Sequence, residues 1–309
     1  LKSLEVNNNK NHKYIYVEVY YQNKILMIMF FQLKFRFSLK ILNWLHMEEL
    51  NFVTPFIVQK HDFKREEFLN LLKKIFNNFK ADIIFLDKNP KYIDEILNPL
   101  SFYKNTFSEK IPIINLGNNT WNRYYENIAN SKTRQTDRRK EKLLSQKGNL
   151  EFIIAETLND KEDIFKFTLK NKLLFLKKRG HETKKFEKIY TQLFDLIKND
   201  PNYICSMLKF NDQIISSIIS RLEKKNLYYL LPCTLEKDFL QYSPGRIILK
   251  KQIEWCFENE INKIDLGPGE FKYKNQWANG VDNYFKIVEP KSFLGNIYFL
   301  LYKLKNIFN

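Results

Sequence analysis

The chain has 309 residues, of which 44% are hydrophobic and 16% aromatic, and its formal net charge is +16. This composition excludes a disordered chain, and the length allows one large core or two smaller ones. The positive charge suits acidic partners such as nucleic acid, coenzyme phosphates or an anionic membrane, and equally suits a solvated lysine-rich surface.

The first part of the chain has the pattern of several strands and two helices. Strand-like alternation or composition occurs at residues 13–22, 25–33, 36–44, 52–58 and 81–87. Helical spacing of apolar residues occurs at 64–79, and residues 90–100 also favour a helix. We therefore expect an α/β arrangement with strands in front. Because the sequence opens on Leu1 and a polar stretch, we also expect that an N-terminal piece is missing.

The second part begins with an extended segment at 111–117 and continues with strands and helices in alternation. Helices are predicted at 121–128, 130–147, 160–178, 183–198, 243–260 and 293–308. Strands are predicted at 150–155, 203–210, 213–222, 227–233, 261–266 and 281–288.

The start of the 243–260 helix has residues that favour an anion. Ser243 is a good N-cap, and Pro244 suits the first helical position. Gly245 allows a close approach to the backbone, and Arg246 adds a guanidinium to the free N–H groups and the helix dipole. These residues predict a phosphate site, with an ordinary capped helix as the alternative.

The segment from Asp265 to Trp277 gathers polar groups at the end of a short strand. Carboxylates, a phenol and an ammonium gathered at one place can serve as a general base, a general acid and an anion ligand. Asp265 or Glu270 would be the base and Tyr273 the acid, while Lys274 would bind an anion or stabilise an oxyanion. The alternative is a turn whose polar groups bond one another, with Lys274 pairing Glu270.

The helix at 130–147 is strongly basic. Arg134 and Arg138 share a face at a spacing of four, and arginine fits phosphate with two hydrogen bonds, so both are candidate substrate ligands. Tyr229 and Trp277 are candidates for stacking on substrate. A solvated face and core aromatic residues are the alternatives.

The cysteines and the last helix add two further expectations. The three cysteines lie far apart in apolar surroundings, which predicts core thiols, and no metal-ligand spacing occurs, so no metal is expected. The helix at 293–308 is amphipathic, which predicts packing on its own domain or contact with an anionic membrane.

The order of elements from residue 120 to 290 resembles the BioF-like or CelD-like acetyltransferases of the GNAT superfamily, relatives of the FemABX peptidyltransferases. The residues that carry the resemblance are the basic helix Ser131 to Leu144, the sequence Tyr242-Ser243-Pro244-Gly245-Arg246, and the segment from Asp265 to Trp277. Residues 13–120 match only in strand order. Asn211-Asp212 stands where the family usually has glycine.

The resemblance implies two tandem GNAT-like halves, residues 1–118 (degenerate) and 119–309, each with a mixed sheet that opens between two parallel strands. An acyl thioester would lie in that opening, with its pyrophosphate at the helix that starts at Ser243. Only Gln241 and Gly245 match the usual phosphate loop of the family. Coenzyme A therefore stays one of two donors, because FemABX relatives use aminoacyl-tRNA.

We expect a cytoplasmic N-acyltransferase, with peripheral contact to the inner membrane face as an option. Its donor would be acetyl-CoA, another acyl-CoA or an acyl carrier thioester. Its acceptor would be an amine on a small or sugar-linked acidic molecule, in cell-envelope or polysaccharide biosynthesis. The alternatives are a FemABX-type aminoacyltransferase that binds tRNA, and a non-catalytic binding member of a polysaccharide assembly system; DNA is not an expected partner.

Overall fold

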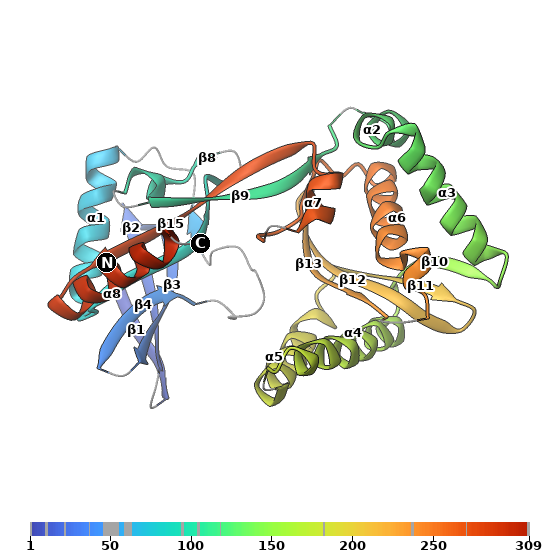
Figure 1. Ribbon diagram of the computed structural model, residues 1–309. Helices are drawn as coiled ribbons and strands as arrows, with labels where there is room; N and C mark the ends of the chain where they lie inside the picture. The colour runs from blue at the N-terminus through green and yellow to red at the C-terminus, as the bar shows by residue number, and fades with distance from the viewer. Residues whose placement is uncertain are drawn as a thin grey trace. The chain divides into compact units, whose positions relative to one another are not determined.

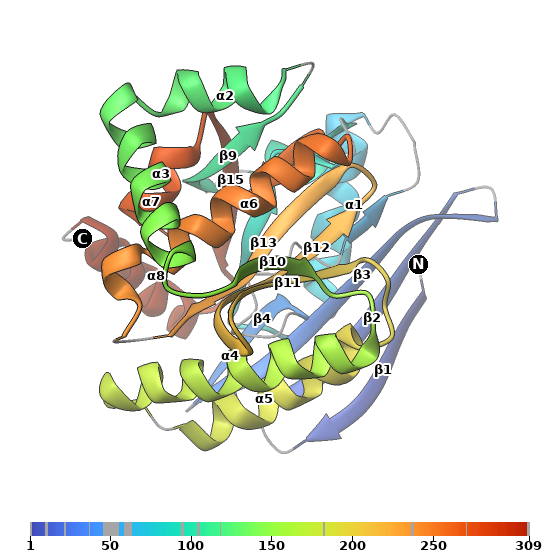
Figure 2. The same ribbon diagram turned by 90° about the vertical axis from the view of Figure 1, so that its right-hand side faces the viewer.

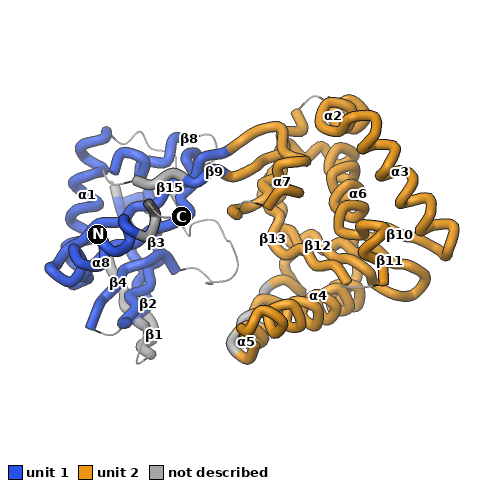
Figure 3. The backbone as a smooth tube through the Cα atoms, in the orientation of Figure 1, with its two compact units in different colours: residues 1–48, 52–110, 282–309 blue, residues 49–51, 111–281 orange. Residues whose placement is uncertain are grey.

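The protein is described by a computed structural model (Figure 1). The structure describes residues 2–9, 12–21, 23–36, 38–45, 56–58, 64–93, 96–103, 106–117, 119–181, 183–235, 238–269 and 271–307. The chain forms two compact units, shown in blue and orange in Figure 3. Unit 1 contains residues 1–48, 52–110 and 282–309, and unit 2 contains residues 49–51 and 111–281.

Unit 1 is built on a mixed sheet. Its elements are β1 (Lys2–Asn9), β2 (His12–Tyr21), β3 (Lys24–Arg36), β4 (Leu39–Trp44), β5 (Phe56–Val58), α1 (Arg65–Asn78), β6 (Ile83–Pro90), β7 (Tyr92–Ile93), β8 (Ile96–Leu97), η1 (Pro99–Phe102) and α8 (Phe293–Ile307). Strands β9 (Thr106–Asn115) and β15 (Gly280–Pro290) carry the chain out to unit 2 and back. The strand order is β1-β2-β3-β4-β6-β15, with β5 beside β3.

Side chains of neighbouring residues on β6 point to opposite faces of the sheet, and each face has its own core. Ile84 and Leu86 belong to the cluster that α1 covers through Phe68, Leu72, Ile75 and Phe76. Ile83 belongs to a second cluster, which α8 covers through Tyr298, Phe299 and Tyr302. The two helices therefore cover opposite faces of one sheet.

Two predictions for unit 1 differ from the structure. Residues 90–100 were expected to be helical, but they form the short β7–β8 hairpin and a 3-10 turn. The cause is Asn98, whose side chain donates to the Pro90 carbonyl at 2.8 Å and accepts from the Leu100 N–H, closing a loop instead of a helix. Strand β1 lies in the segment that the sequence marked only as polar.

Unit 2 holds most of the helices. Its elements are α2 (Trp121–Ile128), α3 (Ser131–Ser145), β10 (Leu150–Ile154), α4 (Leu158–Lys178), α5 (Thr183–Ile197), β11 (Tyr203–Phe210), β12 (Gln213–Glu223), β13 (Asn226–Thr234), η2 (Leu240–Tyr242), α6 (Pro244–Glu258), β14 (Lys263–Asp265) and α7 (Lys272–Trp277). The strand order is β9-β14-β13-β12-β11-β10. Figures 1 and 2 show α4 and α5 on one face of β10–β13 and α6 on the other.

Strands β13 and β14 are the parallel pair of unit 2, and they separate early. Their register runs only from Asn226 opposite Lys263 to Tyr228 opposite Asp265. Strand β13 continues to Thr234, six residues beyond its last pairing with β14 in the described part of the chain, while β12 stays paired with it along its other edge. The expectation of a mixed α/β sheet that opens between parallel strands is met at this point.

The segment after Asp282 was expected in the C-terminal half, but it packs with unit 1. Gly295 allows this, because a Cβ at that position would lie 1.9 Å from the backbone oxygen of Asp82. Among the described residues, no helix is long and apolar enough to cross a membrane.

Candidate active site

A cavity of about 450 Å³ lies where β12 and β13 meet the start of α6. It is lined by six of the candidate site residues, namely Ser243, Gly245, Arg246, Tyr229, Tyr273 and Trp277, and by Pro244. The cavity also reaches Ser216, Ser217, Cys233 and Thr234 on the two strands. Strand β13 and the first turn of α6 therefore border the same cavity within unit 2.

Ser243 occupies the N-cap position of α6, but it does not cap the helix. Its backbone is left-handed, with φ of 56°, and its side chain makes no capping hydrogen bond. The Ser243 hydroxyl instead accepts from Nζ of Lys140 at 2.7 Å. The prediction of a serine N-cap was therefore wrong, and a lysine ammonium from α3 lies at this helix start.

The first turn of α6 leaves one backbone donor for other use. Pro244 has no N–H, and the N–H groups of Arg246 and Ile247 both donate to the Ser243 carbonyl. Within the described part of the chain, the Gly245 N–H donates to no carbonyl group. A Cβ on Gly245 would lie 2.8 Å from Oγ1 of Thr234, so a glycine is needed for close packing on β13.

Arg246 is held by several protein groups at once. Its Nε and Nη2 donate to the two carboxylate oxygens of Asp137 at 2.7 and 2.9 Å, and Nη1 donates to Oε1 of Gln276 at 3.2 Å. The guanidinium also lies 4.6 Å from the centre of the Trp277 ring. Arg246 thus lines the cavity with a fixed orientation, and a phosphate would share it with Asp137.

Helix α3 presents a different face to α6 than the sequence suggested. Arg134 donates to the carbonyls of Ala129 and Glu126 at the end of α2, and Arg138 is exposed. Asp137 and Lys140, at a spacing of three, reach the start of α6, and Glu141 pairs with Lys250 and Lys251 further along that helix. Arg134 and Arg138 do not line the cavity, and their role as substrate ligands stays a prediction.

Tyr229 and Tyr273 hydrogen bond to each other at the cavity wall. Burial raises the pKa of Tyr229 well above its ordinary value, and the Tyr273 partner raises it further. Burial also raises the pKa of Tyr273, although the hydrogen bond from Tyr229 opposes this. Both phenols therefore keep their protons at neutral pH, and Tyr273 can act as a proton donor.

Trp277 is buried in a stack of aromatic rings. Its ring lies nearly parallel to Tyr125 at 6.0 Å between centres, and Tyr125 stacks on Trp121 at 4.8 Å. The hydroxyl of Tyr124 donates to the Trp277 carbonyl. Trp277 therefore contributes an edge to the cavity while its main contacts are in the core.

Asp265 is the last residue of β14 and Lys274 lies in α7, and neither of them lines the cavity. Asp265 is buried and accepts the Gly267 N–H at 2.7 Å. Lys274 is also buried, and its Nζ donates to the carbonyls of Gly267 and Pro268 at 3.1 and 2.7 Å. Glu270 lies outside the described residues. These contacts shape the turn that leads to Tyr273, and the chemical roles of Asp265, Glu270 and Lys274 stay predictions.

Sequence reasoning missed a polar strip on the sheet side of the cavity. Ser217 and Thr168 on α4 share a hydrogen bond at 2.8 Å, and the Ser216 hydroxyl donates to the Cys233 carbonyl at 2.9 Å. Ser216 and Thr234 are 3.0 Å apart. The signal was present in the sequence, because Ser216, Ser217 and Ser220 interrupt an otherwise apolar buried stretch of β12.

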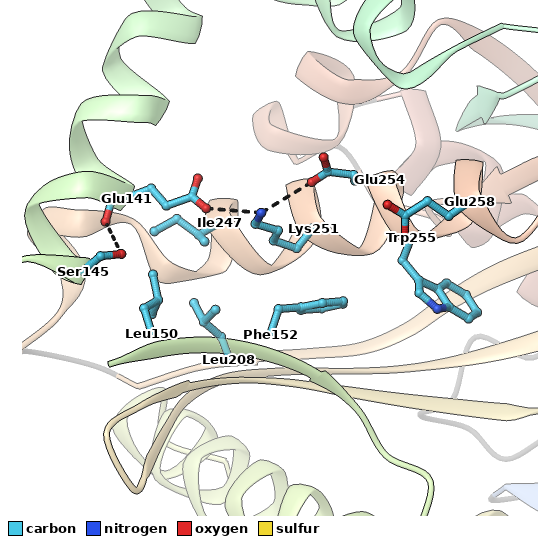
Figure 4. A pocket seen from close by; sticks show the side chains of 10 residues that line it. All are labelled: Glu141, Ser145, Leu150, Phe152, Leu208, Ile247, Lys251, Glu254, Trp255 and Glu258. Carbon is cyan, nitrogen blue, oxygen red and sulfur yellow. Dashed lines mark hydrogen bonds and ion pairs between the residues drawn. The ribbon is translucent and has the colours of Figure 1, made fainter. Parts of the chain in front are cut away.

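A second cavity, also about 450 Å³, lies against another face of α6 (Figure 4). Its floor is apolar, with Leu150, Phe152 and Leu208 facing α6. At its rim Lys251 lies 3.5 Å from both Glu141 and Glu254. The single ammonium lies between two carboxylates, and none of the candidate site residues lines this cavity.

Comparison with known proteins identifies part of the chain. Residues 131–275 match the family model described as an acetyltransferase (GNAT) domain. No curated protein matches the chain. The matched range contains the basic helix, the start of α6 and Tyr273.

Several solved structures share this fold and align with most of the chain. FemX aligns with a TM-score of 0.59 at 12% identity, over 89% of this chain and 87% of FemX. L-PGS from Bacillus licheniformis aligns with a TM-score of 0.51 at 10% identity, over 89% of this chain and 85% of L-PGS. A conserved protein of unknown function from Bacteroides thetaiotaomicron aligns with a TM-score of 0.54 at 6% identity, over 90% and 86% of the two chains.

At these sequence identities the structural similarity shows a shared fold alone. The family model, in contrast, matches the part of the sequence that contains the residues lining the cavity. The resemblance expected from the sequence is thereby confirmed for this part of the chain: residues 131–275 match an acetyltransferase (GNAT) domain.

Proposed function

We propose that the chain is an N-acyltransferase that moves an acyl group from acyl-CoA, or from an acyl carrier thioester, to an amine. The single observation that carries the proposal is the cavity at the start of α6, which lies beside the end of β13 that continues past β14, within the range that matches the GNAT domain. The acceptor would be an amine on a small or sugar-linked acidic molecule, and cell-envelope or polysaccharide biosynthesis the setting.

The start of α6 suits the phosphates of such a donor. The Gly245 N–H and the positive end of the helix dipole lie at the cavity, and Lys140 adds an ammonium beside Ser243. Phosphate oxygens would compete with the Ser243 hydroxyl for the Lys140 protons. Lys140 is therefore the residue that we assign to donor binding in addition to Ser243, Gly245 and Arg246.

The cavity also suits the chemistry of acyl transfer. The donor supplies a thioester, whose carbonyl carbon forms a bond to the amine nitrogen while its bond to sulfur breaks. The amine proton passes to a base, for which Asp265 and Glu270 are the candidates. Tyr273 lines the cavity with a protonated phenol, and we assign it the proton that neutralises the departing sulfur. No covalent enzyme intermediate is required.

Binding of acetyl-CoA tests the proposal, measured by isothermal titration calorimetry on the full chain. Lys140→Met removes one charged contact, which corresponds to roughly a tenfold or greater loss of affinity. Lys142→Met is the matched control, because Lys142 is exposed on the same helix, and its affinity should stay near that of the wild type. Mass spectrometry of ligands that copurify with the protein would name the acyl group. If neither acetyl-CoA nor a longer acyl-CoA binds, the proposal fails.

Aminoacyl transfer from tRNA is the second candidate, and one observation favours it. The outer face of α3 exposes Lys132, Arg138, Arg139 and Lys142 to solvent, and such a row of cations suits a nucleic acid backbone. Filter binding of tRNA at increasing salt distinguishes the two candidates. A steep salt dependence that Arg138→Gln weakens would support the tRNA donor, and an absence of binding would remove it.

A further inference from the structure

We propose that the outer face of α8 docks on the surface of an anionic lipid bilayer. The proposal concerns unit 1 and does not depend on the reaction proposed for unit 2. It rests on the exposure of apolar side chains along one side of the helix, on how the helix is fixed, and on the charges that accompany it.

The exposed face of α8 is apolar along the length of the helix. Six large apolar side chains are between 43% and 79% exposed, namely Phe293, Leu294, Ile297, Leu300, Leu301 and Leu304. At 3.6 residues per turn, these six positions fall within an arc of about 120°. A continuous apolar stripe of this kind is typical of helices that lie in a membrane interface.

The helix is anchored by its opposite face, so the apolar stripe cannot turn inward. Tyr298, Phe299 and Tyr302 pack on the second core cluster of unit 1. At the start of the helix, the Ser292 hydroxyl donates to Oδ1 of Asp82 at 2.6 Å and accepts the Gly295 N–H at 3.1 Å. The stripe is therefore held outward by fixed contacts.

The charges that this helix itself carries are those that an anionic surface attracts. The helix contains Lys303 and Lys305 and no acidic residue. Lys303 Nζ lies 4.5 Å from the centre of the Phe299 ring, and Arg36 is close enough to lower the pKa of Tyr298, against the larger effect of burial. Lysine side chains beside an apolar stripe reach lipid phosphates while their methylene groups remain in the interface.

The size of the stripe argues against a second copy of the chain as the occupant. A helix of 15 residues is about 22 Å long and about 10 Å wide, so its face covers roughly 220 Å². A stable protein interface usually buries about 800 Å² on each partner. A bilayer has no such minimum, because each inserted side chain contributes separately.

Vesicle sedimentation with the full chain tests the proposal. Vesicles of phosphatidylcholine mixed with phosphatidylglycerol should pull the protein down, and vesicles of phosphatidylcholine alone should do so several-fold less. The double variant Leu300→Gln, Leu301→Gln should lower the partition coefficient roughly tenfold or more, because two apolar side chains no longer insert. The double variant Leu174→Gln, Phe175→Gln alters exposed apolar residues of α4 and should bind as the wild type does.

Other outcomes overturn the proposal. Equal sedimentation of the α8 variant and the wild type would show that another surface binds lipid. A wild-type dimer in light scattering that becomes a monomer in the α8 variant would assign the stripe to a second copy. Acetyl-CoA binding should be the same in the wild type and the α8 variant. If the protein does not bind lipid, the proposed reaction is therefore unaffected. If it does not bind acetyl-CoA, the proposed lipid binding is equally unaffected.

Discussion

Arg246 and Asp137 form a two-point ion pair that joins the start of α6 to the middle of α3. The carboxylate of Asp137 accepts two guanidinium bonds at 2.7 and 2.9 Å, and it also accepts the Tyr125 hydroxyl at 2.5 Å. Asp137 is thus the shared acceptor of two elements, and it fixes the side chain that borders the cavity.

Asp137→Asn should destabilise the protein by about 2 kcal/mol, because the neutral amide cannot accept both guanidinium bonds in a site that is largely buried. Urea unfolding measures the change. Asp195→Asn is the matched control, since Asp195 pairs with Lys198 on the surface, and its effect should stay below about 0.5 kcal/mol. Equal effects of the two substitutions would contradict the structural role given to Asp137.

Gly245→Ala should cost about 1 to 2 kcal/mol, because the new methyl group would lie 2.8 Å from Oγ1 of Thr234. Thr234→Ala removes that oxygen and should recover most of the loss in the double variant. Thr234→Ser keeps the hydroxyl, so it should not recover the lost stability. Free energies of unfolding for the single and double variants give the coupling energy, and a value near zero would show that the two positions are not in contact.

Lys274→Met should lower the free energy of unfolding by about 2 kcal/mol, because the carbonyls of Gly267 and Pro268 lose their charged donor in a buried turn. Acyl transfer should fall with it, since this turn leads to Tyr273. Thermal unfolding measured beside activity separates the roles. A variant that keeps its melting temperature and loses transfer would instead assign the ammonium to the chemistry.

The buried tyrosines predict a loss of stability at alkaline pH. Burial raises the pKa of Tyr124, Tyr125 and Tyr229 above the ordinary value of 10.0. Their contribution is complete below about pH 10, the unfolded value, and is lost as the pH rises through the folded values. Urea unfolding between about pH 8 and about pH 11 should show the decline, and Tyr124→Phe should make it shallower.

Much of the fold could be predicted because local patterns decide it. The spacing of Phe68, Leu72, Ile75 and Phe76 fixes both the existence of α1 and its buried face. Ile93, Ile96 and Leu97 also have helical spacing, yet they form a hairpin because Asn98 bonds back to Pro90. That contact pairs residues eight positions apart, and apolar periodicity carries no information about it.

The site could be predicted only in part, for a related reason. The start of α6 stands out in the sequence by its Ser-Pro-Gly-Arg residues, and four of them line the cavity. The importance of Asp137 and Lys140 depends on which face of α3 meets α6. Because α3 is polar on most sides, its sequence gives no apolar stripe to orient it.

The path of the chain through the two units determines which unit is translated completely first. Residues 111–281 of unit 2 are contiguous, whereas unit 1 needs residues 282–309 to cover one face of its sheet with α8. Translation therefore completes residues 131–275, which match the GNAT domain, before the helix α8 that covers the earlier strands. Until α8 is made, the face of the unit 1 sheet that holds Ile41 and Ile83 lacks its helical cover.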